Sequence, residues 1–407
     1  GSWSECLERL GNSVPPLFMR AIAGQIAYTM FGGAEPVQTL RAITDYPAHL
    51  EAAWQQHLAP REPDAPTVIS TFAGAGGSSL GYKWAGFREL LAIDFDDNAV
   101  ETFKLNFPEV HCWKRDIKTV TGKEILEFCK LKPGQLDVLD GSPPCQGFST
   151  AGKRKVTDPR NDLFKEYVRL IQELQPKVFV MENVSGMVKG PMKGRFIEIM
   201  RELKATGYNV RCKLMNAKWY EVPQSRERVI FIGVKDGEPS FPRPGNTCIS
   251  VAEALGLNCS IKTRSQKINP WMDGRDGAAT ICKTNAGYEA LIQGKSDLAM
   301  AAIKPTWQIS RVLSGQEKKK HFSLVEVCAN KPSPTITKDC GNTTTGMIHP
   351  YEIRKLTILE IKRLSSFPDE FKTIGTFHEQ WARIGNAVMP RFMYHIAKNI
   401  KENILHA

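Results

Sequence analysis

The stretch TVISTFAGAGGSSLG, at residues 67–81, decides the predicted fold. Its first six residues are mostly apolar or β-branched, which predicts a short buried strand. Gly74, Gly76 and Gly77 follow and predict a tight turn, and the next residues predict a helix. A glycine turn of this kind lets the backbone approach a ligand closely at a helix N-terminus. The pattern fits a nucleotide-like cofactor, while a turn without any ligand and a dinucleotide-dependent dehydrogenase are the alternatives at this point.

Outward from this stretch, strand-like and helix-like segments alternate as far as residue 235. The segments ELLAID, QLDVLDG, KVFVMENV and ERVIFIGV predict further strands, and helices are predicted between them. This alternation predicts an α/β fold whose doubly wound, mostly parallel sheet is covered by helices on both faces. The predicted domains are an N-terminal helical segment at 1–35, a linker at 36–66, a core at 67–240, a smaller irregular region at 241–345, and a C-terminal return to the core at 346–407.

The composition is typical of a soluble globular protein with an anionic partner. Of the 407 residues, 42% are hydrophobic and 24% are charged, and the formal charge of +11 favours an anionic partner, of which nucleic acid is one. No apolar run approaches the ~20 residues that a membrane span needs. None of the ten cysteines forms a C-x-x-C pair, so no metal site and no disulfide framework are expected. The expected location is the cytoplasm, beside the nucleoid, in a bacterium, or the nucleus in a eukaryote.

Two polar stretches lie at the carboxyl ends of predicted strands and a third comes just before one, and all three contain residue types that active sites use. In GSPPCQGFS, two prolines fix the backbone before Cys145, which suits a nucleophile at the carboxyl end of a parallel strand; a buried loop cysteine is the alternative. Glu182 ends another strand, where a carboxylate is costly unless it is paired or used, and Asn183 beside it also fits a helix cap. In QSRERV, Arg226 and Arg228 share one face if the segment is extended. Such a face fits either a base or phosphate contact or a solvated surface.

Together, six stretches resemble the DNA (cytosine-5)-methyltransferase family: FAGAGG, GSPPCQGFS, ENV, QSRERV, RKLTILEIKRLSSFPDEF and GNAVMP. They occur in the family's usual order over residues 67–235 and 346–400. The resemblance implies a Rossmann-like class I methyltransferase core, with residues 241–345 as a target-recognition domain. It also implies transfer of a methyl group from S-adenosylmethionine to carbon 5 of a flipped-out cytosine in duplex DNA, at a specific short sequence. An RNA (tRNA) methyltransferase with the same core and a catalytically inactive DNA-binding regulator are the alternatives.

The resemblance also implies roles for individual residues of the catalytic site. Cys145 matches the nucleophile that adds to carbon 6 of cytosine, and Glu182 matches the acid that binds ring nitrogen 3 and the exocyclic amine. Arg228 matches the arginine near the cytosine 2-oxygen. The remaining expected catalytic and substrate-binding positions are Arg226, Asn183, Gln146, Ser149 and Gln224. A restriction endonuclease is the implied partner at the system level, and the chain is expected to be a monomer.

An S-adenosylmethionine pocket is implied around the glycine turn. Asp94 matches the acid that binds the ribose, Phe95 is expected to stack on adenine, and Asp116 is expected to accept a hydrogen bond from the adenine amine. The full set of implied cofactor residues is Phe72, Ala73, Gly74, Gly76, Gly77, Asp94, Phe95, Asp116, Ile117, Pro144, Leu163, Asn386 and Val388.

One phrase occurs near both ends of the chain. RLGNSVPPLFMRAIAGQI, residues 9–26, recurs as RIGNAVMPRFMYHIAKNI at residues 383–400. In this family, one copy of the element packs beside the first strand of the core, where it closes the cofactor pocket. We expect the C-terminal copy to occupy this position through Asn386 and Val388. The alternative is that the N-terminal copy occupies it through Asn12. Self-association through residues 3–33 is a further hypothesis.

Overall fold

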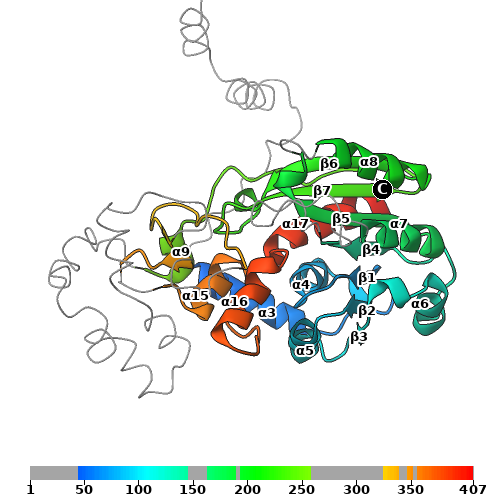
Figure 1. Cartoon of the computed structure of the whole chain (residues 1–407). Coiled ribbons are helices and arrows are strands. Elements are labelled where there is room, and N and C mark those ends of the chain that lie inside the picture. Colours follow the sequence, from blue (N-terminus) through cyan, green and yellow to red (C-terminus); the bar gives the residue numbers. More distant parts are fainter. Residues whose placement is uncertain are drawn as a thin grey trace, which may run out of the picture. The chain divides into compact units, whose positions relative to one another are not determined.

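A seven-stranded sheet forms the centre of the fold in a computed structural model, which describes residues 45–144, 163–188, 193–257, 324–338, 346–351 and 355–406. The strand order is β3-β2-β1-β4-β5-β7-β6 (Figure 1). The first five strands run parallel to one another, and β7 is antiparallel to both of its neighbours. The predicted doubly wound, mostly parallel sheet is therefore confirmed. The strands are β1 (Thr67–Thr71), β2 (Arg88–Asp94), β3 (Cys112–Lys114), β4 (Val138–Gly141), β5 (Val178–Val184), β6 (Asn209–Asn216) and β7 (Glu227–Val234).

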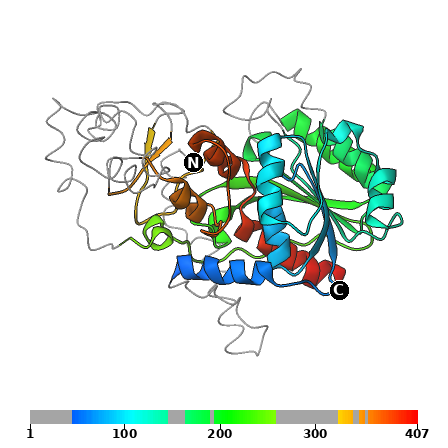
Figure 2. The ribbon, with the colours of Figure 1, turned by 90° about the horizontal axis from the view of Figure 1, so that it is seen from below.

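Helices cover both faces of the sheet, because side chains alternate along each buried strand (Figure 2). Val68 and Val138 point to the face that carries α4 and α17, whereas Ile69 and Leu139 point to the face that carries α6, α7 and α8. The helices are α3 (Tyr46–Leu58), α4 (Gly77–Trp84), α5 (Asp97–Asn106), α6 (Gly122–Cys129), α7 (Leu163–Leu174), α8 (Lys193–Ala205), α9 (Val251–Leu255), α15 (Ile358–Leu364), α16 (Phe377–Asn386) and α17 (Pro390–Ile400). Short helical turns are η1 (Ile117–Thr119), η4 (Ser185–Val188), η6 (Ala217–Trp219) and η7 (Lys401–Leu405), and a small second sheet joins β8 (Leu324–Glu326) to β9 (Gly346–Ile348).

Helix α17 packs closely on α4, the helix that follows β1. Gly77 and Gly81 lie one turn apart on α4, at the contact with α17. A Cβ atom on Gly81 would stand 2.6 Å from the Cβ atom of Met393, and one on Gly77 would collide with the carbonyl oxygen of Val388. Glycine at these two positions therefore lets α17 approach the α4 backbone, and the C-terminal copy of the repeated phrase lies against the glycine turn.

The prediction of a linker over residues 36–66 was wrong for residues 46–58, which form α3. Asp45 caps this helix by accepting a hydrogen bond from the backbone N–H of Ala48, at 3.1 Å. The apolar face of α3 is buried, and the helix contacts α4 and α9 (Figure 2, where α3 is blue). Its helical spacing was obscured because the opposite face carries alanine and glutamine, and because a stretch rich in proline follows it.

Most of residues 241–345 and the whole of residues 1–44 lie outside the described residues. The described ends of the irregular region add Val251, Val327 and Ile336 to the apolar cluster that α15 and α16 also build. Within the described part of the chain, no helix is both long and apolar enough to span a membrane. The same part holds no cluster of three or more His, Cys, Asp or Glu side chains arranged to bind a metal ion.

Candidate active site

The polar stretches singled out in the sequence meet at one edge of the sheet. Strands β1, β2, β4 and β5 are parallel, so their carboxyl ends share that edge, and β7 begins there because it runs the other way. The strand order reverses between β1 and β4, and ligands of open α/β sheets bind at such a switch point.

Glu182 and Arg228 form a buried ion pair at this edge. Glu182 lies opposite Ile230 and Arg228 lies opposite Val184, so both side chains stand on the same face of the sheet. Nε of Arg228 is 2.6 Å from Oε1 of Glu182, and the two side chains are 13% and 11% exposed. A carboxylate held by a guanidinium in this way presents fixed acceptors and donors to a planar polar ring. The structure thus brings together two residues that the sequence assigned to one site.

Asn183 anchors the loop that leads to Cys145. Its Nδ2 atom donates to the carbonyl oxygen of Pro143 at 3.2 Å, and its Oδ1 atom accepts from the N–H of Val184 at 2.9 Å. The side chain is buried, and the bond ties the end of β5 to the segment that leaves β4. Cys145, Gln146 and Ser149 lie outside the described residues, and half-buried Pro144 is the last described residue before them.

Asp94 holds the glycine turn in place. Its Oδ2 atom accepts from the N–H of Gly74 at 2.8 Å, and its Oδ1 atom accepts from the N–H of Asp96 at 3.0 Å. Burial raises the pKa of Asp94, although these N–H groups counteract the rise. Gly74 has a φ of +56°, and no atom lies within 4 Å of the place where its Cβ would stand. Phe72 also has a positive φ, of 54°, which shows how sharply the chain turns after β1.

The remaining predicted cofactor residues surround the same edge. Phe95 follows β2 and is 69% exposed. Asp116 is exposed and accepts from the N–H of Lys118 at 3.0 Å, while Ile117 beside it is buried. Ala73 donates its N–H to the carbonyl oxygen of Ile93 at 3.1 Å. Further members of the predicted set are half-buried Leu163 at the start of α7, exposed Asn386 at the end of α16, buried Val388, and buried Gly76 and Gly77 at the start of α4.

Gln224, predicted to bind substrate, is buried, and its amide is bonded within the protein. Its side chain is 0% exposed. Nε2 donates to Oγ of Ser365 at 3.1 Å and to the carbonyl oxygen of Leu364 at 3.3 Å, and Oε1 accepts from the N–H of Ile336 at 3.1 Å. Both ends of the amide are occupied, so Gln224 joins three distant segments of the chain.

Arg226 is also a structural link in this arrangement. It donates to the carbonyl oxygens of Ile336 at 2.8 Å and of Gly385 at 2.9 Å. Burial lowers the pKa of Arg226 well below its usual range, and the nearby charge of Arg228 adds to this effect. Arg226 is 3% exposed, so its guanidinium is used inside the protein, where it joins the start of β7 to residues 336 and 385.

Sequence reasoning missed a buried acid next to the Pro-Pro loop. Asp140, in β4, is 2% exposed. Its carboxylate accepts from Oγ of Ser78 at 2.6 Å and from the hydroxyl of Tyr82 at 3.3 Å, both on α4. Burial raises the pKa of Asp140 to about 7, against the lowering effect of these two hydrogen bonds. The signal in the sequence was an acid inside an otherwise apolar strand, in VLDG.

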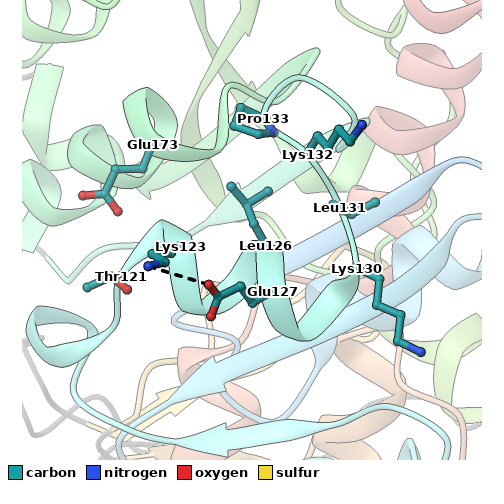
Figure 3. Close-up of a pocket in the computed structure, with 9 residues that line it drawn as sticks. All are labelled: Thr121, Lys123, Leu126, Glu127, Lys130, Leu131, Lys132, Pro133 and Glu173. Carbon is teal, nitrogen blue, oxygen red and sulfur yellow. Dashed lines mark ion pairs between the residues drawn. The ribbon is translucent and has the colours of Figure 1, made fainter.

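A separate pocket of about 640 Å³ lies between α6 and α7 (Figure 3). It is lined by Thr121, Lys123, Leu126, Glu127, Lys130, Leu131, Lys132, Pro133 and Glu173. None of the residues predicted for the active site is among them, so this pocket is distinct from the sheet edge described above.

Comparison with known proteins agrees with the geometry of this edge. The profile of the C-5 cytosine-specific DNA methylase family matches residues 66–402. The Type II methyltransferase M1.HphI of Haemophilus parahaemolyticus is 34% identical over 353 residues, which cover 82% of this chain and 86% of the relative. The Type II methyltransferase M.FnuDI of Fusobacterium nucleatum is 34% identical over 346 residues, which cover 83% of this chain and 94% of the relative.

Solved structures share the fold. A candidate DNA modification methyltransferase encoded within an E. coli prophage superposes with a TM-score of 0.61 and 27% identity, covering 84% of this chain and 100% of that one. S. pombe Dnmt2 methyltransferase superposes with a TM-score of 0.53 and 16% identity, covering 83% of this chain and 99% of that one, a likeness of fold alone. From its matched profile and its relatives, the chain belongs to the family of C-5 cytosine-specific DNA methylases and is a DNA cytosine-5 methyltransferase.

Proposed function

We propose that the chain methylates a cytosine flipped out of duplex DNA, with S-adenosylmethionine as methyl donor and Cys145 as nucleophile. The observation that carries the proposal is the buried Glu182–Arg228 ion pair, at the same sheet edge as the glycine turn and the anchored Pro-Pro loop. A base stacked in a duplex cannot reach a buried pair of this kind, so the base must leave the stack, at a cost of a few kcal/mol.

The proposed reaction begins with the Cys145 thiolate, which forms a bond to carbon 6 and shifts electron density to carbon 5. Glu182 binds ring nitrogen 3 and the exocyclic amine and stabilises the charge that builds on the ring. Arg228 holds the Glu182 carboxylate through the 2.6 Å contact and lies near the 2-oxygen. S-adenosylmethionine supplies the methyl group when bound. A base then removes the proton from carbon 5, and the bond between sulfur and carbon 6 breaks.

The residues at the glycine turn fit this cofactor. Gly74 leaves open space where a side chain would stand, and Phe95 presents an exposed ring that can stack on adenine. Each Asp94 oxygen accepts one backbone N–H, and each keeps a lone pair for a ribose hydroxyl. Asp116 is exposed and can accept from an amine, and the loop of Asn386 and Val388 completes the pocket next to α4.

Loss of the thiol is the direct test of this mechanism. Cys145→Ala protein is incubated with S-adenosylmethionine carrying a tritiated methyl group and with duplex DNA. We expect no transfer, because no sulfur remains to activate the ring. Cys129→Ala is the control, since Cys129 is a free cysteine at the end of α6, outside the site and outside residues 241–345. Methyl transfer by Cys145→Ala at the control rate would show that another group activates the ring.

In this proposal, residues 241–345 recognise the DNA sequence that is methylated. Two relatives are named Type II methyltransferases, which supports methylation of one short sequence and a paired restriction endonuclease at the system level. Exchanging residues 258–323 for the corresponding segment of a related methylase should change the methylated site, read by bisulfite sequencing. An unchanged site would assign recognition to another part of the chain.

A further inference from the structure

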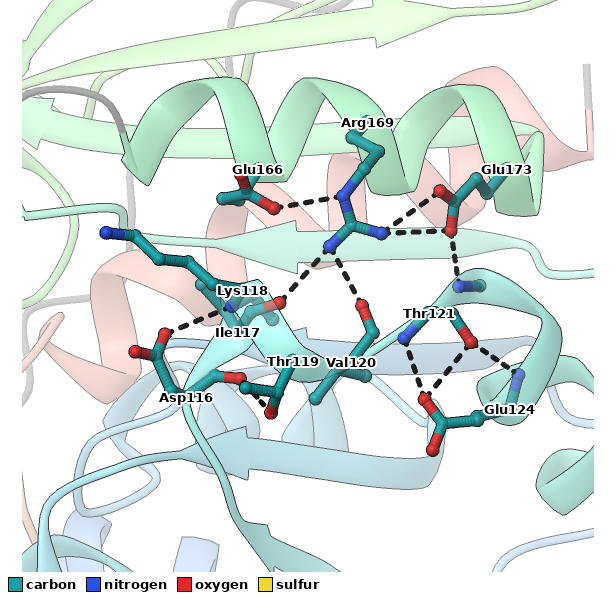
Figure 4. Close-up of polar contacts among 11 residues, drawn as sticks. Asp116, Ile117, Lys118, Thr119, Val120, Thr121, Glu124, Glu166, Arg169 and Glu173 are labelled. Atoms are coloured by element: carbon teal, nitrogen blue, oxygen red, sulfur yellow. Dashed lines mark hydrogen bonds and ion pairs between the residues drawn. The ribbon is translucent and has the colours of Figure 1, made fainter.

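Arg169 of α7 is bound to the loop that carries Asp116 and Ile117 (Figure 4). Its Nη2 atom donates to the carbonyl oxygen of Val120 at 2.8 Å and to that of Ile117 at 3.2 Å. Two acids of the same helix orient the guanidinium. Nε donates to Glu166 at 2.9 Å, and Nη1 donates to both oxygens of Glu173 at 3.0 Å. All three guanidinium nitrogens are thus engaged in a fixed planar arrangement.

The loop also has contacts of its own, since Arg115 donates to the carbonyl oxygen of Thr119 at 2.6 Å and the side chains of Ile117 and Val120 are buried. Asp116 caps the short turn η1, and the turn contains the bonds from the N–H of Thr119 to Asp116 and from the N–H of Val120 to Ile117, at 2.9 and 3.3 Å. A turn of three residues is too short to be stable alone. Glu173 accepts in addition from the N–H of Gly122, so α7 holds both the middle and the end of the loop.

We propose that Arg169 is a positioning residue for S-adenosylmethionine: it fixes the 116–120 loop so that Asp116 and Ile117 meet the adenine. The inference rests on the cofactor site proposed above. Arg169 acts through the loop backbone and touches no reacting atom. Leu163, about two turns earlier on the same helix, is also a residue of the proposed cofactor site, so in this proposal α7 contributes to the site at two points.

Four variants test the proposal. Arg169→Met removes every donor but keeps the aliphatic stem, Arg169→Lys keeps the charge without the planar fork, and Asp116→Ala removes the proposed adenine contact. Arg211→Met is the control, because Arg211 is an exposed arginine of the edge strand β6 that pairs with Glu238 at 2.6 Å, away from the site. Calorimetric titration gives the Kd of S-adenosylmethionine, steady-state kinetics give kcat and both KM values, and thermal unfolding checks that each variant folds.

We expect Arg169→Met to raise the Kd and KM of S-adenosylmethionine about tenfold, the effect of one lost charge-assisted hydrogen bond, with kcat and the KM of DNA nearly unchanged. Arg169→Lys should recover only part of the affinity, and Arg211→Met should bind like the wild type. Should Arg169→Met lower the thermal midpoint, Glu166→Gln replaces it, because that change only loosens the guanidinium and should cause a smaller rise in Kd.

Three results would overturn the proposal, and each has a different meaning. Normal cofactor affinity in Arg169→Met with weakened affinity in Asp116→Ala would refute the role of Arg169 alone. Normal affinity in Asp116→Ala would remove the adenine contact from the loop, and the proposed cofactor site would fail together with this inference. Equal losses in kcat, in the KM of DNA and in the KM of cofactor would reveal a general structural role instead.

Discussion

Asp140→Asn is expected to stabilise the protein at alkaline pH and to change its stability little at acid pH. Burial raises the pKa of Asp140 from the ordinary value of 3.8 to about 7. The folded protein therefore keeps a proton that the unfolded chain releases, and stability falls as the pH rises from about 4 to about 7. Asparagine does not titrate, and its amide can still accept from Ser78 and donate to the hydroxyl of Tyr82.

The size of this change in stability follows from the shift in the pKa of Asp140. A difference of about 3 pKa units, at 1.36 kcal/mol per unit, corresponds to about 4 kcal/mol of stability lost by the wild type above pH 7. The free energy of unfolding of Asp140→Asn should thus exceed that of the wild type by up to about 4 kcal/mol at about pH 8.5, with little difference at about pH 4.

Urea unfolding followed by tryptophan fluorescence measures both free energies. Glu89→Gln is a companion variant, since burial raises the pKa of Glu89 to about 8 and its advantage should appear at a higher pH. Glu51→Gln, at an exposed position of α3, is the control and should show no such dependence. If Asp140→Asn differed from the wild type by the same amount at both pH values, the carboxyl would have to be charged in the folded protein throughout, and the reasoning from burial would fail.

Three further outcomes are expected. Gly81→Val should separate α17 from α4 and destabilise the protein by about 1–3 kcal/mol, seen as a lower thermal midpoint; an unchanged midpoint would show that the two helices are not in close contact. Arg228→Met should leave the Glu182 carboxylate buried without its partner, costing about 3–5 kcal/mol of stability and abolishing methyl transfer, whereas Glu182→Gln combined with Arg228→Met should regain the stability but not the activity. Gln224→Ala should cost about 1–3 kcal/mol in urea unfolding without altering the KM of DNA; a raised KM with unchanged stability would instead support the predicted substrate contact.

The sheet could be predicted where its strands are buried on both faces. β5 and β7 contain nearly continuous apolar runs, and such runs bounded by turns identify strands buried on both faces. β1 is buried throughout, and its Val, Ile and Thr residues favour a strand although three of its five residues are Thr or Ser. Two strands were missed for physical reasons. β3 has three residues, and β6 is an edge strand whose exposed Arg211 and Lys213 resemble a loop.

The sequence predicts those parts of the site that lie at the ends of predicted strands. Parallel strands bring their carboxyl ends to one edge, so the proximity of Glu182, Asp94 and the glycine turn follows from the order of elements. The orientation of Arg226 does not follow, because β7 begins only at Glu227 and strand alternation does not apply before it. The two hydroxyls that bind Asp140 come from α4, a partner that periodicity within β4 cannot reveal.

The contact between α4 and α17 also determines when the core can finish folding during synthesis. Lys401 donates to the carbonyl oxygen of Ala85, a residue 316 positions earlier in the chain. At about 5–20 residues per second, the ribosome needs on the order of tens of seconds to make that stretch. Throughout this interval the apolar side of α4 lacks its cover, and the loop of Val388 has not yet reached the glycine turn. In every nascent molecule the proposed cofactor pocket therefore stays incomplete until α17 emerges from the ribosome.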